Sequence, residues 1–200
     1  MNTVFFDVDT QIDFLYPAGA LYVPGAEEIV ETVGALNRFA GAHGIPLISD
    51  IDAHTENDLE FLDWPPHCVA GTWGQRKPAN TLLESRLVLS SRAPLDFWPA
   101  GVSQLMLEKQ SLDAFSNPRL PGFLQRLGAE RFVVYGVVTE ICVQRVAWGL
   151  IAMGKRVELV TDAVMHLNQQ EARRTFEEFQ RAGGTLTTSV HITGASTRLA

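Results

Sequence analysis

A cysteine stands between an apolar run, residues 131–135, and an amphipathic run, residues 143–153. The pattern predicts a strand, a tight turn and a helix, with Cys142 at the start of the helix. Unpaired N–H groups and the positive end of the helix dipole favour a thiolate there, so we expect the Cys142 pKa to be at least one unit below its usual value of about 8.5. Cys142 is therefore a candidate nucleophile. The alternative is a small buried apolar residue.

Two charged residues follow other apolar runs and could handle protons. Asp9 comes directly after residues 4–8, and Lys109 comes just after residues 104–107. A carboxylate at a strand end can act as a general acid or base, and a neighbouring lysine would stabilise both that carboxylate and a thiolate. We expect Asp7 and Asp9 on the same side of the strand, where their repulsion would raise one pKa. The alternatives are a solvated turn aspartate and a surface lysine.

A third group has the residue types of a metal site. Asp52 and His54 are separated by one residue, so both side chains face the same way in an extended segment. His67, in the run Trp64-Pro65-Pro66-His67-Cys68, would complete a set of three nitrogen and oxygen ligands that leaves positions for water or substrate. We predict a divalent metal ion here. The alternative is a turn aspartate with two surface histidines.

The elements that must position these residues are strands alternating with helices. Residues 26–42 have a helical pattern, and Asn168 to Glu171 predict the cap of a helix that Gly183-Gly184 would end. Apolar runs of strand length cover residues 4–8, 46–49, 87–90, 104–107, 131–135, 157–160 and 185–190. We predict an α/β fold, a three-layer α/β/α sandwich with a mostly parallel central sheet, as a single domain over residues 1–200 with its site at the carboxyl ends of the strands. Residues 74–101 would form a surface excursion.

Composition excludes several function classes. The 200 residues carry a formal net charge of -7, and the 16 lysines and arginines form no run, so nucleic acid is not an expected partner. Two cysteines are too few for a disulfide framework, and no apolar stretch reaches the roughly 18 residues of a membrane span. We expect a cytoplasmic protein without a membrane partner.

Several motifs in combination carry a resemblance to a known family. They are Asp9-Thr10-Gln11-Ile12-Asp13-Phe14, Gly19-Ala20-Leu21 with Val23-Pro24-Gly25, Trp64-Pro65-Pro66-His67-Cys68-Val69 with Gly71-Thr72-Trp73-Gly74, Lys109, and Gly136-Val137-Val138-Thr139-Glu140-Ile141-Cys142. From Val4 to about Val190 the chain resembles the isochorismatase-like cysteine hydrolase superfamily, and is most similar to its nicotinamidase and pyrazinamidase branch.

The resemblance implies roles for particular residues. Asp9, Lys109 and Cys142 map onto a catalytic triad, and Asp52, His54 and His67 onto the metal ligands, with zinc the expected ion and iron or manganese the alternatives. It also implies a cis peptide between Val137 and Val138, an oxyanion hole from the N–H groups of Val138 and Cys142, and a substrate ring flanked by Phe14 and Trp64.

The implied activity is hydrolysis of a small carboxamide to an acid and ammonia through a thioester. Nicotinamide, in NAD salvage, is the expected substrate, and a homo-oligomer the expected assembly. Ala53 and Asp58 stand where many nicotinamidases have an aromatic residue and a histidine, so maleamate or an N-carbamoyl or ureido compound is an alternative. Two further alternatives are a non-catalytic binding protein of the same fold and a redox sensor, for which Cys68 would have to act as the resolving thiol.

Overall fold

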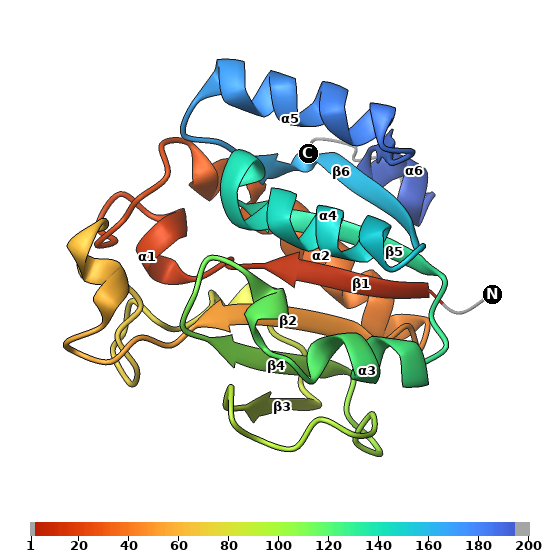
Figure 1. Cartoon of the computed structure of the whole chain (residues 1–200), viewed down its shortest axis with the longest axis horizontal. Coiled ribbons are helices and arrows are strands. Elements are labelled where there is room, and N and C mark those ends of the chain that lie inside the picture. Colours follow the sequence, from red (N-terminus) through yellow and green to blue (C-terminus); the bar gives the residue numbers. More distant parts are fainter. Residues whose placement is uncertain (1–2, 195–200) are drawn as a thin grey trace.

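A computed structural model of the protein describes residues 3–194, whose strands form one twisted sheet (Figure 1). The strand order is β3-β4-β2-β1-β5-β6-β7, and every pairing is parallel. The strands are β1 (Thr3–Val8), β2 (Leu47–Asp52), β3 (Arg86–Leu89), β4 (Gln104–Lys109), β5 (Arg131–Val137), β6 (Arg156–Met165) and β7 (Thr185–Thr187). The predicted parallel sheet is confirmed.

Helices cover both faces of the sheet and make the three predicted layers. In Figure 1, α3 (Leu120–Arg126) and α4 (Gln144–Ala152) lie in front of the sheet and α2 (Val30–Ala42) lies behind it. The short α6 (Ser189–Thr193) contacts α2, and α5 (Gln169–Arg181) contacts α4. One turn of helix, α1 (Ile12–Leu15), follows β1. Shorter 3₁₀ turns cover Ala26–Ile29, Leu59–Leu62, Ala79–Thr81 and Ala114–Ser116, and a π-helical turn covers Thr139–Val143.

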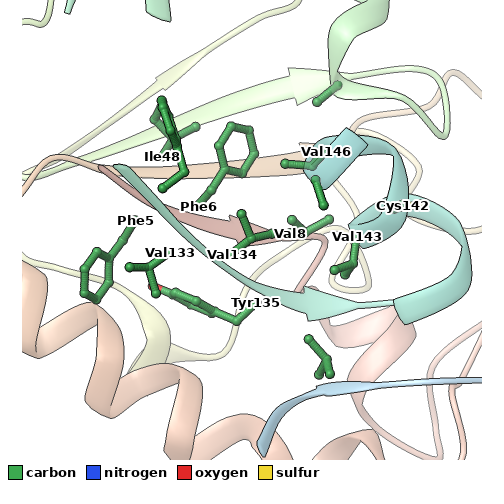
Figure 2. Packing of buried hydrophobic residues seen from close by; sticks show 14 of the residues in the cluster. Phe5, Phe6, Val8, Ile48, Val133, Val134, Tyr135, Cys142, Val143 and Val146 are labelled. Carbon is green, nitrogen blue, oxygen red and sulfur yellow. The ribbon is translucent and has the colours of Figure 1, made fainter. Parts of the chain in front are cut away.

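The central strands are apolar on both faces because both faces are covered. Figure 2 shows Phe5 and Tyr135 on one side of the sheet and Phe6 on the other, with Val146 of α4 nearby. Phe5 stacks against Phe39 of α2 with 6.2 Å between ring centroids. Burial of this kind removes most of these rings from water and is the main favourable term in folding.

The predicted elements differ from the structure mainly at their ends. The run 157–160 is part of the longer β6, whose pairing with β5 continues, after an irregularity, to Val137 and Met165. The run 185–190 holds only β7 before α6 begins, because the Thr188 side chain accepts a hydrogen bond from the His191 N–H and caps a helix there. The predicted Asn168 cap is confirmed, since its side chain accepts from the N–H groups of Gln170 and Glu171.

The sheet topology puts the candidate site at one edge. From β1 the chain first builds the sheet on one side, through β2, β3 and β4, and then on the other, through β5, β6 and β7, so a crevice forms at the carboxyl ends of β1 and its neighbours. No helix among residues 3–194 combines the length and the apolar character needed to cross a membrane.

Candidate active site

The structure brings Asp9, Lys109 and Cys142 together at the carboxyl ends of three strands. Asp9 follows β1, Lys109 ends β4, and Cys142 lies in the π-helical turn after β5. Lys109 Nζ lies 2.9 Å from Asp9 Oδ2, and the Cys142 thiol lies near enough to Asp9 for the charge of that carboxylate to act on it. All three side chains are buried. The arrangement places a base and a fixed positive charge beside the sulfur, which is the geometry of an activated nucleophile.

The predicted cis peptide is present between Val137 and Val138. It joins the last residue of β5 to the residue before the turn that carries the thiol, and Val138 and Cys142 both line the same pocket. Their backbone N–H groups remain our proposal for the oxyanion hole.

The protonation of the thiol differs from the expectation. Burial, followed by the negative charge of Asp9, raises the pKa of Cys142 well above its usual value, although Lys109 opposes the shift. The prediction of a lowered pKa was wrong because it counted the helix end and ignored the loss of water around the sulfur. The resting thiol is therefore neutral, and its proton has to leave as the sulfur attacks.

The neighbouring Asp9 carboxylate also has a shifted pKa. Burial, and then the charge of Asp52, raise the pKa of Asp9 from 3.8 to about 7, although Lys109 lowers it. A carboxylate that titrates near neutral pH is a more effective general base than an ordinary aspartate.

Asp7 and Asp9 do not form the predicted pair. Asp7 accepts hydrogen bonds from Asn37 of α2 and from Lys77, whereas Asp9 contacts Lys109. Asp9 has a backbone φ of 49°, in the left-handed region, so the regular alternation of a strand ends before it. The alternation rule failed at this residue for that reason.

Four side chains converge next to the triad and could hold a metal ion. Asp52, His54, Glu60 and His67 each offer one ligand atom, and these atoms all lie within 4.8 Å of one another. The Nε2 atoms of His54 and His67 lie 3.7 Å from Asp52 Oδ2 and 3.8 Å from Glu60 Oε1. His54 Nε2 and Glu60 Oε1 are buried without a hydrogen-bond partner, which is costly unless a cation lies between them.

The outer nitrogens of the two histidines each lie near a separate oxygen atom. His54 Nδ1 lies 3.1 Å from Asp58 Oδ2, and His67 Nδ1 lies 2.7 Å from the Pro65 carbonyl oxygen. Such contacts orient the imidazoles so that each Nε2 would face a bound ion. Two nitrogen and two oxygen donors suit zinc, so the residues fit the group that the family implies.

Glu60 was missed by the sequence analysis. It lies in the 3₁₀ turn Leu59–Leu62, where no ligand spacing identifies it. The same turn directs Phe61 onto both histidines, with ring centroids 5.2 Å from His54 and 5.6 Å from His67. Asp58, two residues earlier, caps this turn by accepting from the Glu60 N–H. The only sequence signal for this turn was Asp58, an acidic residue at the cap position.

The metal group is tied to the triad through Asp52. Lys109 Nζ donates to Asp52 Oδ1 at 2.5 Å, so one ammonium group contacts both Asp9 and a candidate metal ligand. The Gln11 side chain holds the backbone of Asp52. Its amide nitrogen donates to the Asp52 carbonyl at 2.8 Å, and its amide oxygen accepts from the Asp52 N–H at 2.7 Å.

A small apolar pocket with a volume of about 30 Å³ opens onto the sulfur. Phe14 and Trp64, the predicted substrate-flanking residues, both line it, as do Cys142 and the candidate ligands Asp52, Glu60 and His67. Leu112, three residues after Lys109, also lines the pocket. The remaining apolar lining comes from Leu21, Val23, Val138, Ile141 and Leu167. Neither lysine nor arginine contributes to the lining of this pocket among the described residues.

We expect His54→Ala and His67→Ala to lose the metal ion and Asp52→Ala to do the same, because each removes one of the converging ligand atoms. Elemental analysis of the purified variants measures the loss directly. His43→Ala is the matched control, since His43 is exposed and bonded to the Phe39 carbonyl at the end of α2. Unchanged metal content in all three ligand variants would contradict the site.

Comparison with known proteins agrees with this geometry. The family model of the isochorismatase domain matches residues 95–190. The Escherichia coli nicotinamidase is 27% identical over 207 residues, which cover 90% of this chain and 92% of that protein. The chain is thus similar to the isochorismatase domain over residues 95–190 and to a nicotinamidase over most of its length.

Solved structures of this superfamily have the same fold. The pyrazinamidase of Pyrococcus horikoshii, in complex with zinc, has a TM-score of 0.76 and 26% identity, covering 94% of this chain and 99% of that one. PnC1 from L. infantum, in complex with nicotinate, has a TM-score of 0.75 and 26% identity, covering 94% and 93%. The predicted superfamily and its nicotinamidase branch are confirmed.

Proposed function

We propose that this isochorismatase-like protein is a cysteine amidohydrolase that converts nicotinamide to nicotinate and ammonia. One observation carries the proposal: Cys142, which lies beside Asp9 and Lys109, lines an apolar pocket together with three of the four candidate metal ligands, Asp52, Glu60 and His67. The similarity to nicotinamidases supports the same reaction.

The chain's own residues supply the proton transfers. The Asp9 carboxylate takes the Cys142 proton as Sγ attacks the amide carbon, and the oxyanion is stabilised by the N–H groups of Val138 and Cys142. Asp9 then gives the proton to the leaving nitrogen, so ammonia departs and a thioester remains. Asp9 next takes a proton from water, whose oxygen attacks the thioester and releases the acid, and the proton returns to the thiolate. Lys109 keeps the carboxylate oriented throughout.

Asp52, His54, Glu60 and His67 would hold the ion, which we take to be zinc. When bound, it would act as a Lewis acid toward an electron-pair donor on the substrate, such as a ring nitrogen. Lys109 contacts both Asp52, a candidate metal ligand, and Asp9, so its ammonium group links the metal-ligand group to the triad.

The pocket lining favours a neutral ring over an acyclic acid. Phe14 and Trp64 can stack on a flat ring, whereas the carboxylate of maleamate or of an N-carbamoyl amino acid finds no lysine or arginine among the described lining residues. Aromatic stacking and coordination of a ring nitrogen add together for nicotinamide.

We therefore expect kcat/KM for nicotinamide to exceed that for maleamate and for an N-carbamoyl amino acid by more than tenfold, or about 1.4 kcal/mol. Trp64→Ala should raise KM for nicotinamide. Trp73→Ala should leave KM unchanged, because Trp73 is exposed and does not line the pocket. A tenfold preference for either acyclic amide, measured by ammonia release, would reject nicotinamide as the substrate.

The setting we propose is the cytoplasm, where the product would enter NAD synthesis, with the enzyme assembled as a homo-oligomer. In the enzyme, Asp9 would take the Cys142 proton as the sulfur attacks, so the neutral thiol should still react with an alkylating agent, whereas a non-catalytic protein of this fold would leave Cys142 unreactive. Alkylation of the native protein with iodoacetamide near neutral pH, followed by peptide mapping, distinguishes it from the enzyme.

A further inference from the structure

A second charged cluster lies beside the triad and takes no part in the proposed chemistry. Lys77 Nζ forms an ion pair with Asp7 Oδ2 at 2.8 Å, and both side chains are fully buried. Lys77 also donates to the hydroxyl and to the carbonyl oxygen of Thr10, and that hydroxyl donates to Asp7 Oδ1 at 2.6 Å. Three buried groups therefore close a ring of contacts, which we call the Lys77 cluster.

A buried ion pair needs an explanation, because it rarely stabilises a fold more than apolar residues of the same volume would. This pair is fully satisfied: Asn37 Nδ2 and Ser49 Oγ also donate to Asp7 Oδ2, at 2.9 and 3.2 Å. Lys77 and Asp7 are 70 positions apart in the chain. The cluster therefore fixes Thr10 from two sides, through its side chain and through its carbonyl group.

Thr10 directly follows the strained residue of the site. Asp9 is a non-glycine residue with a positive φ, a conformation that persists only where the surroundings enforce it. On one side of Asp9 the surroundings are strand β1, and the Asp9 N–H donates to the Asp50 carbonyl. On the other side they are Thr10 and the Lys77 cluster.

The segment that carries Lys77 runs alongside the residues that follow Asp9. The Asp13 N–H donates to the Gly74 carbonyl at 3.0 Å, and the Ile12 N–H donates to the Arg76 carbonyl at 2.8 Å. The approach is so close that a Cβ on Gly74 would come within 2.2 Å of the Asp13 carboxylate. The beginning of the predicted surface excursion is thus a support for the residues that follow β1.

We propose that Lys77, with Asp7 and Thr10, is a positioning residue that holds the left-handed turn at Asp9 and thereby aims the Asp9 carboxylate at the Cys142 thiol. The proposal rests on the proposed function, since it assigns Asp9 the role of base. It differs from a purely structural role in one respect: loss of the cluster slows proton transfer even in a protein that remains folded.

The test uses a variant in which the charges stay balanced. Asp7→Asn with Lys77→Met removes both charges together, and the asparagine can still accept from Asn37 and Ser49 while donating to Thr10. We expect a folded protein whose kcat for amide hydrolysis falls about tenfold to a hundredfold while KM changes less than twofold. The rate of Cys142 alkylation by iodoacetamide at pH 7 should fall in parallel, and this measurement needs no substrate.

Tyr135→Phe is the matched control. It removes the hydroxyl that donates to Asn37 Oδ1 at 2.6 Å, and so cuts the same buried network without touching Thr10. Its kcat and alkylation rate should match the wild type. Thr10→Val is a second variant, in which both charges are retained. It should also lower kcat, and it provides the test if the double variant does not fold.

A wild-type alkylation rate and kcat in the folded double variant, or in folded Thr10→Val, would overturn the proposal. An equal loss in Tyr135→Phe would overturn it too, because the effect would then be general loosening of the network. Failure of the proposed function is distinct, since it would appear as an unreactive Cys142 in the wild-type protein itself.

Discussion

Cys142→Ala abolishes ammonia release from nicotinamide, with kcat reduced by at least about 10³-fold, because the covalent step has no other nucleophile. The substitution removes one buried sulfur atom, so the free energy of unfolding should change by only about 1 kcal/mol. Turnover by purified protein and a thermal unfolding curve measure the two effects separately.

Cys68→Ala provides the comparison. Cys68 is the other cysteine and is fully buried in the hydrophobic core, so its loss should leave kcat close to the wild-type value. Substantial ammonia release by folded Cys142→Ala would rule out the thioester mechanism while leaving the fold and the metal group unaffected.

Asp9→Asn removes the base, and we expect kcat to fall by about 10²- to 10⁴-fold. The same substitution should stabilise the protein. The pKa of Asp9 rises from 3.8 to about 7 on folding, because burial and then Asp52 disfavour its charge. The folded state thus holds this proton more tightly than the unfolded state does.

The sign of the pH effect follows from that difference. The contribution of Asp9 to stability is fully present below about pH 4 and is lost as the pH rises through about 7, a total of about 4 kcal/mol for this rise in pKa. The introduced asparagine cannot ionise, so the variant should be as stable as the wild type at pH 4 and more stable by about 2 to 4 kcal/mol at pH 8.

Urea unfolding at the two pH values, on protein treated with a chelator, tests this directly. The chelator matters because a bound cation offsets the charge of Asp52, the second cause of the raised pKa, so the gain should shrink when zinc is restored. A variant that is less stable than the wild type at pH 8 would show that attraction to Lys109 outweighs the cost of burying Asp9.

The sequence by itself determined the architecture and most of the site. Short, continuously apolar strands alternating with amphipathic helices specify a covered parallel sheet, because only burial on both faces satisfies such strands. Asp9, Asp52 and Lys109 follow or end neighbouring strands, and parallel strands end at one edge, so their meeting was predictable from position alone. The motif around Cys142 placed the thiol there as well.

The tertiary structure alone decided the electrostatics and the distant contacts. The raised pKa of Cys142 depends on how much water the fold removes, a quantity that a local motif does not contain. Glu60 joins the ligand group through the path of a short 3₁₀ turn, and Lys77 reaches Asp7 across 70 residues of chain. Such contacts arise from packing between elements, and periodicity describes each element only on its own.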